Sequence, residues 1–233
     1  MYNLRWRKII SILFLLCAFK LYAQPNLWQY DNKKLHFGFT LAGNIGRLQV
    51  ETRPDFFAND TTKKLGVTSF PGLGLGVIVN YRLGKAWDLR MMAPVISFVQ
   101  RNLVYEYYNS PSKTIKIESA YCDASILIKY KSERFKSKNT RVYVVAGPRI
   151  SYDFSSSINK TRAIENPVVS LEPLTFGWEA GIGLDIYFEY FKLSPELKTC
   201  QTFGNALYRD IYPYTNSIEA IYPQLVQFSL HFE

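Results

Sequence analysis

Strict alternation of apolar with polar or small residues is the clearest pattern in the chain, and it is most regular from Pro173 to Phe188. One set of alternate positions there is apolar, while the other holds three glycines and the carboxylates Glu179 and Asp185. A period of two is the pattern of a β-strand whose faces meet different surroundings. The stretch far exceeds the roughly five or six residues of a typical strand. It therefore predicts a membrane strand, with its apolar face toward lipid and its polar face toward a narrow barrel lumen.

Seven other segments repeat the pattern: Leu35–Leu41, Leu73–Arg82, Trp87–Tyr107, Ile115–Lys131, Val142–Phe154, Tyr190–Phe203 and Leu225–Glu233. Pro94 lies inside the third, and because proline cannot donate to the strand ladder, we expect a β-bulge there. The sequence thus predicts an all-β fold, an eight-stranded antiparallel outer-membrane β-barrel that occupies residues 24–233. The lumen of such a barrel holds side chains or one small ligand. A protein-sized pore is therefore excluded.

The connections between these segments alternate between short and long. With both chain ends in the periplasm, short turns are expected at Gly84–Lys85, at Ser132–Asn139 and near Glu189. Outer loops are expected at residues 45–71, 108–114, 155–172 and 204–223. Short periplasmic turns and longer outer loops are typical of outer-membrane barrels.

The first 23 residues have the composition of a signal peptide. A basic segment precedes the apolar run Ile9 to Phe19, and Ala23 is a small residue suited to a cleavage site. A membrane anchor would need about 20 apolar residues, whereas this run is shorter and Lys20 interrupts it. A lipoprotein modified at Cys17 is disfavoured because Leu16 stands where a small residue is expected. We expect cleavage after Ala23, before the barrel domain.

The charge of the chain gives little support to a nucleic-acid partner. The formal net charge of +9 includes four basic residues within residues 1–23, and their removal leaves +5. The remaining Lys and Arg residues are scattered, whereas nucleic-acid binding favours a basic stripe on a recognisable module. Cys122 and Cys200, the two cysteines of the mature chain, are expected to face opposite ways on non-neighbouring strands. We expect no disulfide between them.

Two sequence features invite a site interpretation. The run Gly72-Leu73-Gly74-Leu75-Gly76 has the spacing of a nucleotide loop, but it lacks the strand, turn and helix that such a loop needs. Glycines facing the lumen explain it better. His36 and His231 lie near the start of the first strand and the end of the last, so barrel closure allows them to be neighbours at the periplasmic end. Without a clear carboxylate partner they are better explained as hydrogen-bonded lining than as half of a metal site.

Charged residues of both signs fall on the inward positions of the predicted strands: Arg82, Arg90, Lys129, Glu179, Asp185, Lys192, Glu196 and Lys198. In a narrow lumen they should pair, because isolated buried charges are costly. A salt-bridged plug is therefore favoured over an ion or ligand path. The sequence indicates no catalytic, cofactor-binding or metal-binding residue, and we expect a protein that is not an enzyme and carries no cofactor.

Four segments resemble the PorT family in their order and spacing: Leu35–Leu41, Leu89–Phe98, Leu127–Lys131 and Phe191–Lys198. The resemblance covers the mature chain, and the last block, Phe-Lys-Leu-Ser-Pro-Glu-Leu-Lys, is more specific than barrel alternation alone. Proteins of that family are outer-membrane barrels required by the type IX secretion system. This system exports cargo with a C-terminal sorting domain and supports gliding motility in some bacteria. The resemblance transfers no functional residue.

The resemblance implies a non-enzymatic component of type IX secretion whose partners are outer-membrane lipid and other secretion proteins. Docking is expected through the long loops, especially 45–71 and 204–223, and through the basic turn at 132–139. One alternative is a generic small barrel that acts as an adhesin or a minor ligand carrier. Another is a barrel enzyme, which would need a Ser, His and acid set converging near one rim.

Overall fold

The computed structural model describes residues 27, 30–53, 62–108, 110–135, 139–156, 169–209 and 218–233. The predicted signal peptide and its cleavage site lie outside these residues. A single 3-10 turn, η1 (Tyr30–Asn32), precedes the strands in the described part of the chain. No helix among the described residues is long and apolar enough to cross a membrane.

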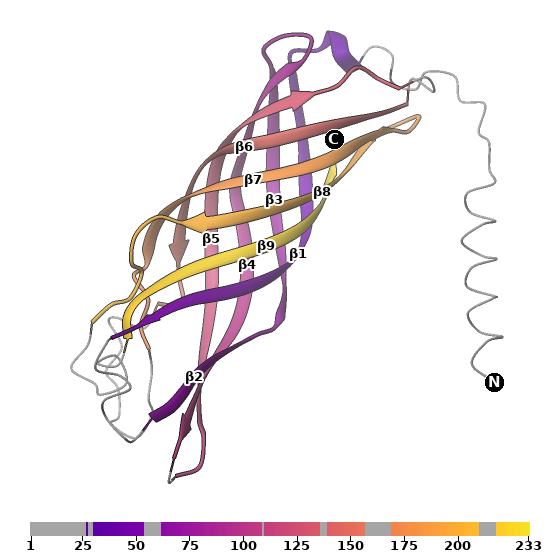
Figure 1. Cartoon of the computed structure of the whole chain (residues 1–233). Coiled ribbons are helices and arrows are strands. Elements are labelled where there is room, and N and C mark those ends of the chain that lie inside the picture. The colour runs from indigo at the N-terminus through magenta and orange to yellow at the C-terminus, as the bar shows by residue number, and fades with distance from the viewer. Residues whose placement is uncertain are drawn as a thin grey trace, which may run out of the picture.

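Antiparallel strands form the rest of the fold: β1 (Leu35–Thr52), β2 (Thr62–Ser69), β3 (Pro71–Arg82), β4 (Trp87–Tyr107), β5 (Lys113–Lys131), β6 (Thr140–Asp153), β7 (Leu174–Tyr187), β8 (Lys192–Thr202) and β9 (Ile218–Phe232). β1 pairs with both β3 and β9, and β4 pairs with β5, so the sheet closes on itself. Figure 1 shows the resulting barrel of steeply tilted strands. The predicted antiparallel barrel is confirmed.

β2 is the strand that exceeds the predicted eight. It lengthens one wall of the barrel and does not widen the ring. β2 and β3 follow one another along β4, and the backbone N–H of Phe70 between them donates to the Gln100 carbonyl at 3.1 Å. The closed ring therefore has eight positions, as predicted. The expected outer loop at 45–71 is wrong in its extent, because β1 continues to Thr52 and β2 occupies 62–69. The expected loop at 204–223 is also too long, because β9 starts at Ile218.

Short connections gather at one end of the barrel, here called the turn end, and the opposite end is called the loop end. β3 and β4 are joined through Gly84, and Phe188 donates its N–H to the Phe191 carbonyl at 2.9 Å where β7 turns into β8. η1 and the chain terminus Glu233 lie at the same end (Figure 1). The predicted turns at 84–85 and near 189 are thus confirmed. The bulge predicted at Pro94 is confirmed by a register shift between Met92 and Val95.

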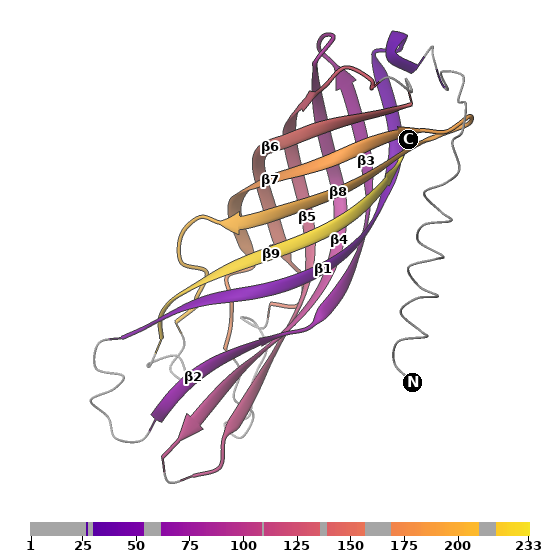
Figure 2. The same ribbon diagram turned by 45° about the vertical axis from the view of Figure 1, so that its right-hand side comes forward.

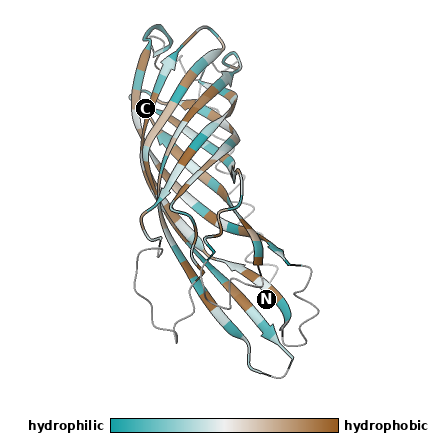
Figure 3. Cartoon of the chain, turned by 90° about the vertical axis from the view of Figure 1, so that its left-hand side faces the viewer, coloured by the Kyte–Doolittle hydropathy of each residue, from teal (hydrophilic) through white to brown (hydrophobic). Residues whose placement is uncertain are grey.

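The two faces of each strand alternate as the sequence predicted. On β7, Phe176 and Ile182 are 53% and 63% exposed on the outer wall, whereas Glu179 and Asp185 are 2% and 0% exposed. Figure 3 shows the alternation of brown and teal residues along the strands. Cys122 faces outward and Cys200 inward, as expected, and both are free.

Toward the loop end, the outward residues change from apolar to polar. Paired strands make this change at the same height along the barrel. Ile45 of β1 is opposite Val226 of β9, and the next outward pair along these strands is Arg47 with Gln224. On β4 the last outward apolar ring is Phe98, opposite Ala120 of β5. The agreement between separate strands marks the upper limit of the membrane zone.

Beyond this level the strands form a projection that we call the outer head, residues 46–52, 62–69, 99–107, 113–119 and 218–225. Figure 2 shows β2 and the ends of β4 and β5 extending past the rest of the barrel. Inside the head an apolar core contains Leu48, Leu103, Tyr105, Ile115, Ile117, Val169, Leu171, Leu207, Ile218 and Ile221. The head is therefore built like a water-soluble β-structure, apolar inside and polar outside.

Candidate functional site

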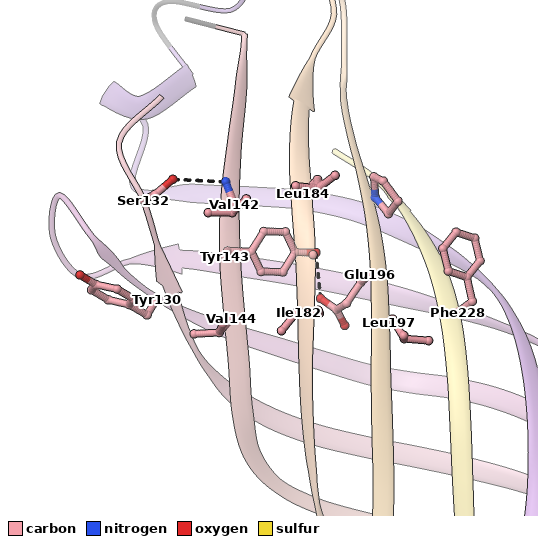
Figure 4. Close-up of a pocket in the computed structure, with 12 residues that line it drawn as sticks. Tyr130, Ser132, Val142, Tyr143, Val144, Ile182, Leu184, Glu196, Leu197 and Phe228 are labelled. Atoms are coloured by element: carbon pink, nitrogen blue, oxygen red, sulfur yellow. Dashed lines mark hydrogen bonds between the residues drawn. The ribbon is translucent and has the colours of Figure 1, made fainter. Parts of the chain in front are cut away.

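The interior of the membrane zone is the first candidate site, and ion pairs fill it. Glu196 of β8 lies at the centre of one group. Its Oε2 accepts from Arg90 Nη1 at 2.5 Å and from the Tyr143 hydroxyl at 2.9 Å. Its Oε1 lies 3.4 Å from Nε2 of His231. Figure 4 shows the Tyr143 to Glu196 bond reaching from β6 to β8. Because these residues come from four different strands, the group crosses the lumen.

Tyr143 reaches across the lumen because β7 carries a glycine where the ring passes. A Cβ added at Gly183 would lie 2.4 Å from Cζ and the hydroxyl oxygen of Tyr143. Any larger residue at this position would displace the ring and its bond to Glu196. The inward glycine thus makes room for a large side chain from the neighbouring strand.

A second group surrounds Asp185 of β7, which is fully buried. Both of its carboxylate oxygens accept from Lys129 Nζ at 2.8 Å, and Oδ2 also accepts from Arg141 Nε at 3.1 Å. The Ser194 hydroxyl donates to Oδ1 at 2.7 Å. One carboxylate therefore forms ion pairs with two cations, and both of its oxygens accept hydrogen bonds.

Three further pairs complete the filling: Lys198 with Glu179 at 3.1 Å, Arg149 with Asp123 at 2.7 Å and Lys131 with Asp88 at 2.6 Å. The predicted salt-bridged plug is confirmed. Arg82 is the exception among the predicted inward charges, because it lies at the turn end and donates to the Gly84 carbonyl. The sequence interpretation omitted Arg141 and Arg149, although their alternate positions on β6 place them inward.

The turn end is closed by η1 and the chain terminus. Glu233 accepts from the Tyr30 hydroxyl at 2.8 Å and pairs with Lys192 at 2.9 Å. Asp31 pairs with Arg134 at 3.0 Å and with Arg141 at 3.2 Å. Burial alone would raise the pKa of Asp31, but the two guanidinium groups outweigh it and hold that pKa below its ordinary value. η1 is thus held by ion pairs to β6 and to the connection that precedes it.

The two histidines are not neighbours. His231 is opposite Thr40 on β1, four residues along the strand from His36. The His36 ring stacks on Tyr30 at 3.9 Å, and its Nε2 lies 2.9 Å from the Tyr30 carbonyl. His231 has the carboxylate partner, Glu196, that the sequence could not assign. No group of three or more metal-ligating side chains is found within the described residues.

The glycine run predicted to line the lumen does so. Gly72, Gly74 and Gly76 lie on β3, and their inward positions alternate with the exposed Leu73 and Leu75. A Cβ at Gly72 would come within 2.0 Å of the Phe98 carbonyl oxygen. The run is therefore a close strand contact and is not a nucleotide loop.

An apolar hollow near these groups lies on the outer wall. It encloses about 650 Å³ above Gly183 and Pro195, and large apolar side chains surround it, including Val144, Ile182 and Phe228 (Figure 4). These residues belong to the lipid-facing set. The hollow is therefore a place for lipid chains on the outer surface of the strands that carry Tyr143 and Glu196.

The chain was compared with known proteins. A family model described as outer membrane protein beta-barrel domain matches residues 22–208. No curated protein matches the chain. Among solved structures, OprG of Pseudomonas aeruginosa is similar with a TM-score of 0.47 and 11% identity, covering 85% of this chain and 92% of that one. Neisserial surface protein A has a TM-score of 0.41 and 10% identity, covering 85% and 98%.

A third solved structure is Ail, the attachment invasion locus protein of Yersinia pestis, in complex with the heparin analogue sucrose octasulfate. Its TM-score is 0.40 at 10% identity, covering 86% of this chain and 99% of that one. The family match extends over most of the chain and agrees with the closed antiparallel ring and its apolar outer wall. This protein therefore belongs to the outer membrane protein beta-barrel domain family and is an outer-membrane β-barrel.

Proposed function

We propose that the protein is a non-enzymatic outer-membrane component of a type IX secretion system, and that it acts as a docking barrel beside a separate conduit. The secretion role rests on the resemblance to the PorT family, above all on the block Phe191–Lys198. The docking role rests on one observation, the ion pairs that fill the lumen. A barrel whose interior is occupied in this way offers partners its surfaces and not a passage.

The filled lumen supports docking because its charges hold one another in place. Removing one member of a buried pair leaves an uncompensated charge and costs about 3–5 kcal/mol. Lys129, Glu179 and Glu196 each take part in such a pair and come from three strands. A path through the barrel would require several of these pairs to break together.

The outer head supports docking because it places polar strands beyond the membrane zone. Lys116 and Glu118 lie on the outward positions of β5, and both are exposed. β2 pairs only with β4 among the described strands, so its second edge has no strand partner among them. Exposed strand edges are recurrent protein recognition sites.

The experiment that tests the secretion role compares the culture-supernatant proteome of a deletion strain with its parent and with a complemented strain. The expected result is loss of cargo with C-terminal sorting domains, retention of their precursors in the periplasm and rescue by complementation. An unchanged supernatant would overturn the secretion role. Lower adherence of the same strain would then favour the adhesin alternative, which the projecting head also suits.

A pair of variants tests the docking surface in the complemented strain. Exchanging the charges at Lys116 and Glu118 (K116E with E118K) keeps the net charge and the strand but reverses the pattern on the head. Lys34→Glu at the turn end is the matched control, since Lys34 is also exposed. We expect cargo secretion to fall with the head variant alone. Equal secretion by the head variant and wild type, with normal barrel levels in the membrane, would refute docking through β5.

A further inference from the structure

Arg101 of β4 is a buried cation that has no acidic partner among the described residues. It is 1% exposed, and its Nη2 donates to the Ser119 hydroxyl at 2.8 Å and to the Tyr121 hydroxyl at 2.6 Å. The Tyr121 ring also lies 5.5 Å from the guanidinium carbon. All of these partners are neutral. Every other buried Lys or Arg among the described residues forms an ion pair with a carboxylate.

The missing partner is an electrostatic problem that neutral groups do not solve. A guanidinium carries a fixed positive charge in proteins. An isolated buried charge is strongly unfavourable unless an opposite charge compensates it. Water or hydroxyl groups satisfy the hydrogen bonds of the guanidinium but carry no net charge. The site therefore calls for an anion that the described residues do not supply.

Unused hydrogen-bonding groups surround the guanidinium. Nε of Arg101 is buried and has no hydrogen-bond partner, and the same is true of Nδ2 and Oδ1 of Asn44. Nε lies against β1, because a Cβ added at Gly46 would be 3.5 Å from it. Asn44 is the next inward residue on that strand and is 2% exposed. Two donors from facing strands, Nε–H and the Asn44 amide, are thus both unsatisfied and enclosed.

We propose that Arg101 and Asn44 form an internal site for a small monovalent anion such as chloride. One negative charge balances the single guanidinium. The ligand is small because Val99 and Tyr121 pack beside the arginine in an apolar cluster with Cys200 and Leu225. The site lies where the charged interior of the membrane zone meets the apolar core of the outer head. A bound anion there completes the pairing of the lumen charges.

The test measures the thermal unfolding midpoint of the refolded mature barrel in detergent, with sodium chloride replaced stepwise by sodium gluconate at constant ionic strength. A ligand that binds only the folded state raises the midpoint in a saturable way. We expect chloride to raise the wild-type midpoint by several degrees, to retain its effect in Arg101→Lys and to lose it in Arg101→Met. Arg47→Met, an exposed change on the same head, should respond as wild type does.

Two results would overturn the proposal. One is a wild-type midpoint that is the same in chloride and in gluconate. The other is an equal chloride effect in wild type and Arg101→Met, which would assign the effect to other charges. Crystals of the wild-type protein soaked in sodium bromide provide a second measurement that does not depend on the folding of a variant. An anomalous peak beside Arg101 Nε supports the site, whereas peaks confined to the surface show an adventitious ion only and contradict it.

Discussion

Asp185→Asn is the substitution that most directly tests whether the lumen is held by charge. The side chains are nearly the same size, so the change removes the negative charge without creating a cavity. Asp185 accepts from Lys129, Arg141 and Ser194. After the change Arg141 still has Asp31 at 3.2 Å, but Lys129 loses the carboxylate with which it forms its ion pair among the described residues.

The expected cost follows from the burial of both partners. The side chains of Lys129 and Asp185 are each 0% exposed, so solvent does not screen the ammonium that remains. Breaking a buried pair by removing one member costs about 3–5 kcal/mol. Replacing both members by apolar residues is often neutral or stabilising by about 1–4 kcal/mol. We therefore expect Asp185→Asn to be much less stable than wild type, and Lys129→Met with Asp185→Leu to recover most of the loss.

Urea unfolding of the refolded barrel in lipid vesicles, followed by tryptophan emission, measures these differences at equilibrium. Trp87 and Trp178 lie on the outer wall and report the loss of the lipid contact. Glu118→Gln on the outer head is the control, because an exposed substitution changes stability by less than about 0.5 kcal/mol. If Asp185→Asn cost no more than Glu118→Gln, the pairing of lumen charges would not be what stabilises the barrel.

Three other predictions follow from the geometry. Gly183→Ala should destabilise the barrel by about 1–3 kcal/mol through overpacking against Tyr143, whereas Gly43→Ala, with open space around its Cβ, should not. Because the pKa of Asp31 is lowered in the folded state, its stabilisation is complete above the ordinary aspartate pKa of about 4 and is lost as the pH falls further. The urea midpoint of wild type should therefore fall more between pH 6 and pH 3 than that of Asp31→Asn. In planar bilayers the purified barrel should show no discrete channel openings.

The outcomes that contradict these predictions are equally specific. Equal stability of the two glycine variants would mean that the Tyr143 ring moves freely. The same loss of midpoint in wild type and Asp31→Asn at low pH would show that η1 is held by something other than the carboxylate of Asp31. Steady conductance steps from wild type would show that the lumen pairs open in the membrane.

The strands of the membrane zone could be predicted well because the same surroundings, lipid outside and a polar lumen inside, apply along all of them. On β7 and β8 the apolar side chains meet lipid and the polar ones meet the lumen, so alternation alone assigns both strand and facing. The inward positions of Glu179, Asp185 and Lys192 could be read in this way. Which charges pair could not, since Glu196 bonds to Arg90 and Tyr143 from strands far away in the sequence. That information is in the register and closure of the ring.

The sequence predicts loops for the β1, β2 and β9 parts of the outer head because the alternation changes phase there. Along β1 the odd-numbered residues are apolar up to Ile45, but beyond it Arg47 and Glu51 are polar while Leu48 and Val50 are apolar. The strand continues, and the surroundings of its faces are exchanged: water replaces lipid outside, and a packed core replaces the charged lumen inside. A search for one phase of the alternation therefore ends the predicted strand at the shift, although β1 continues to Thr52.

The meeting of the first and last strands has a consequence for biogenesis. β1 and β9 form a ladder from Phe39 with Phe232 to Thr52 with Ile218, so partners lie almost the whole barrel sequence apart. Such distant contacts form slowly, because the loop-closure entropy is lost before they are gained. A chain cut short before β9 would leave the edges of both β1 and β8 unpaired, and unsatisfied backbone groups in lipid cost several kcal/mol each. Insertion of this barrel must therefore await its last strand, and a late truncation removes the whole protein from the membrane.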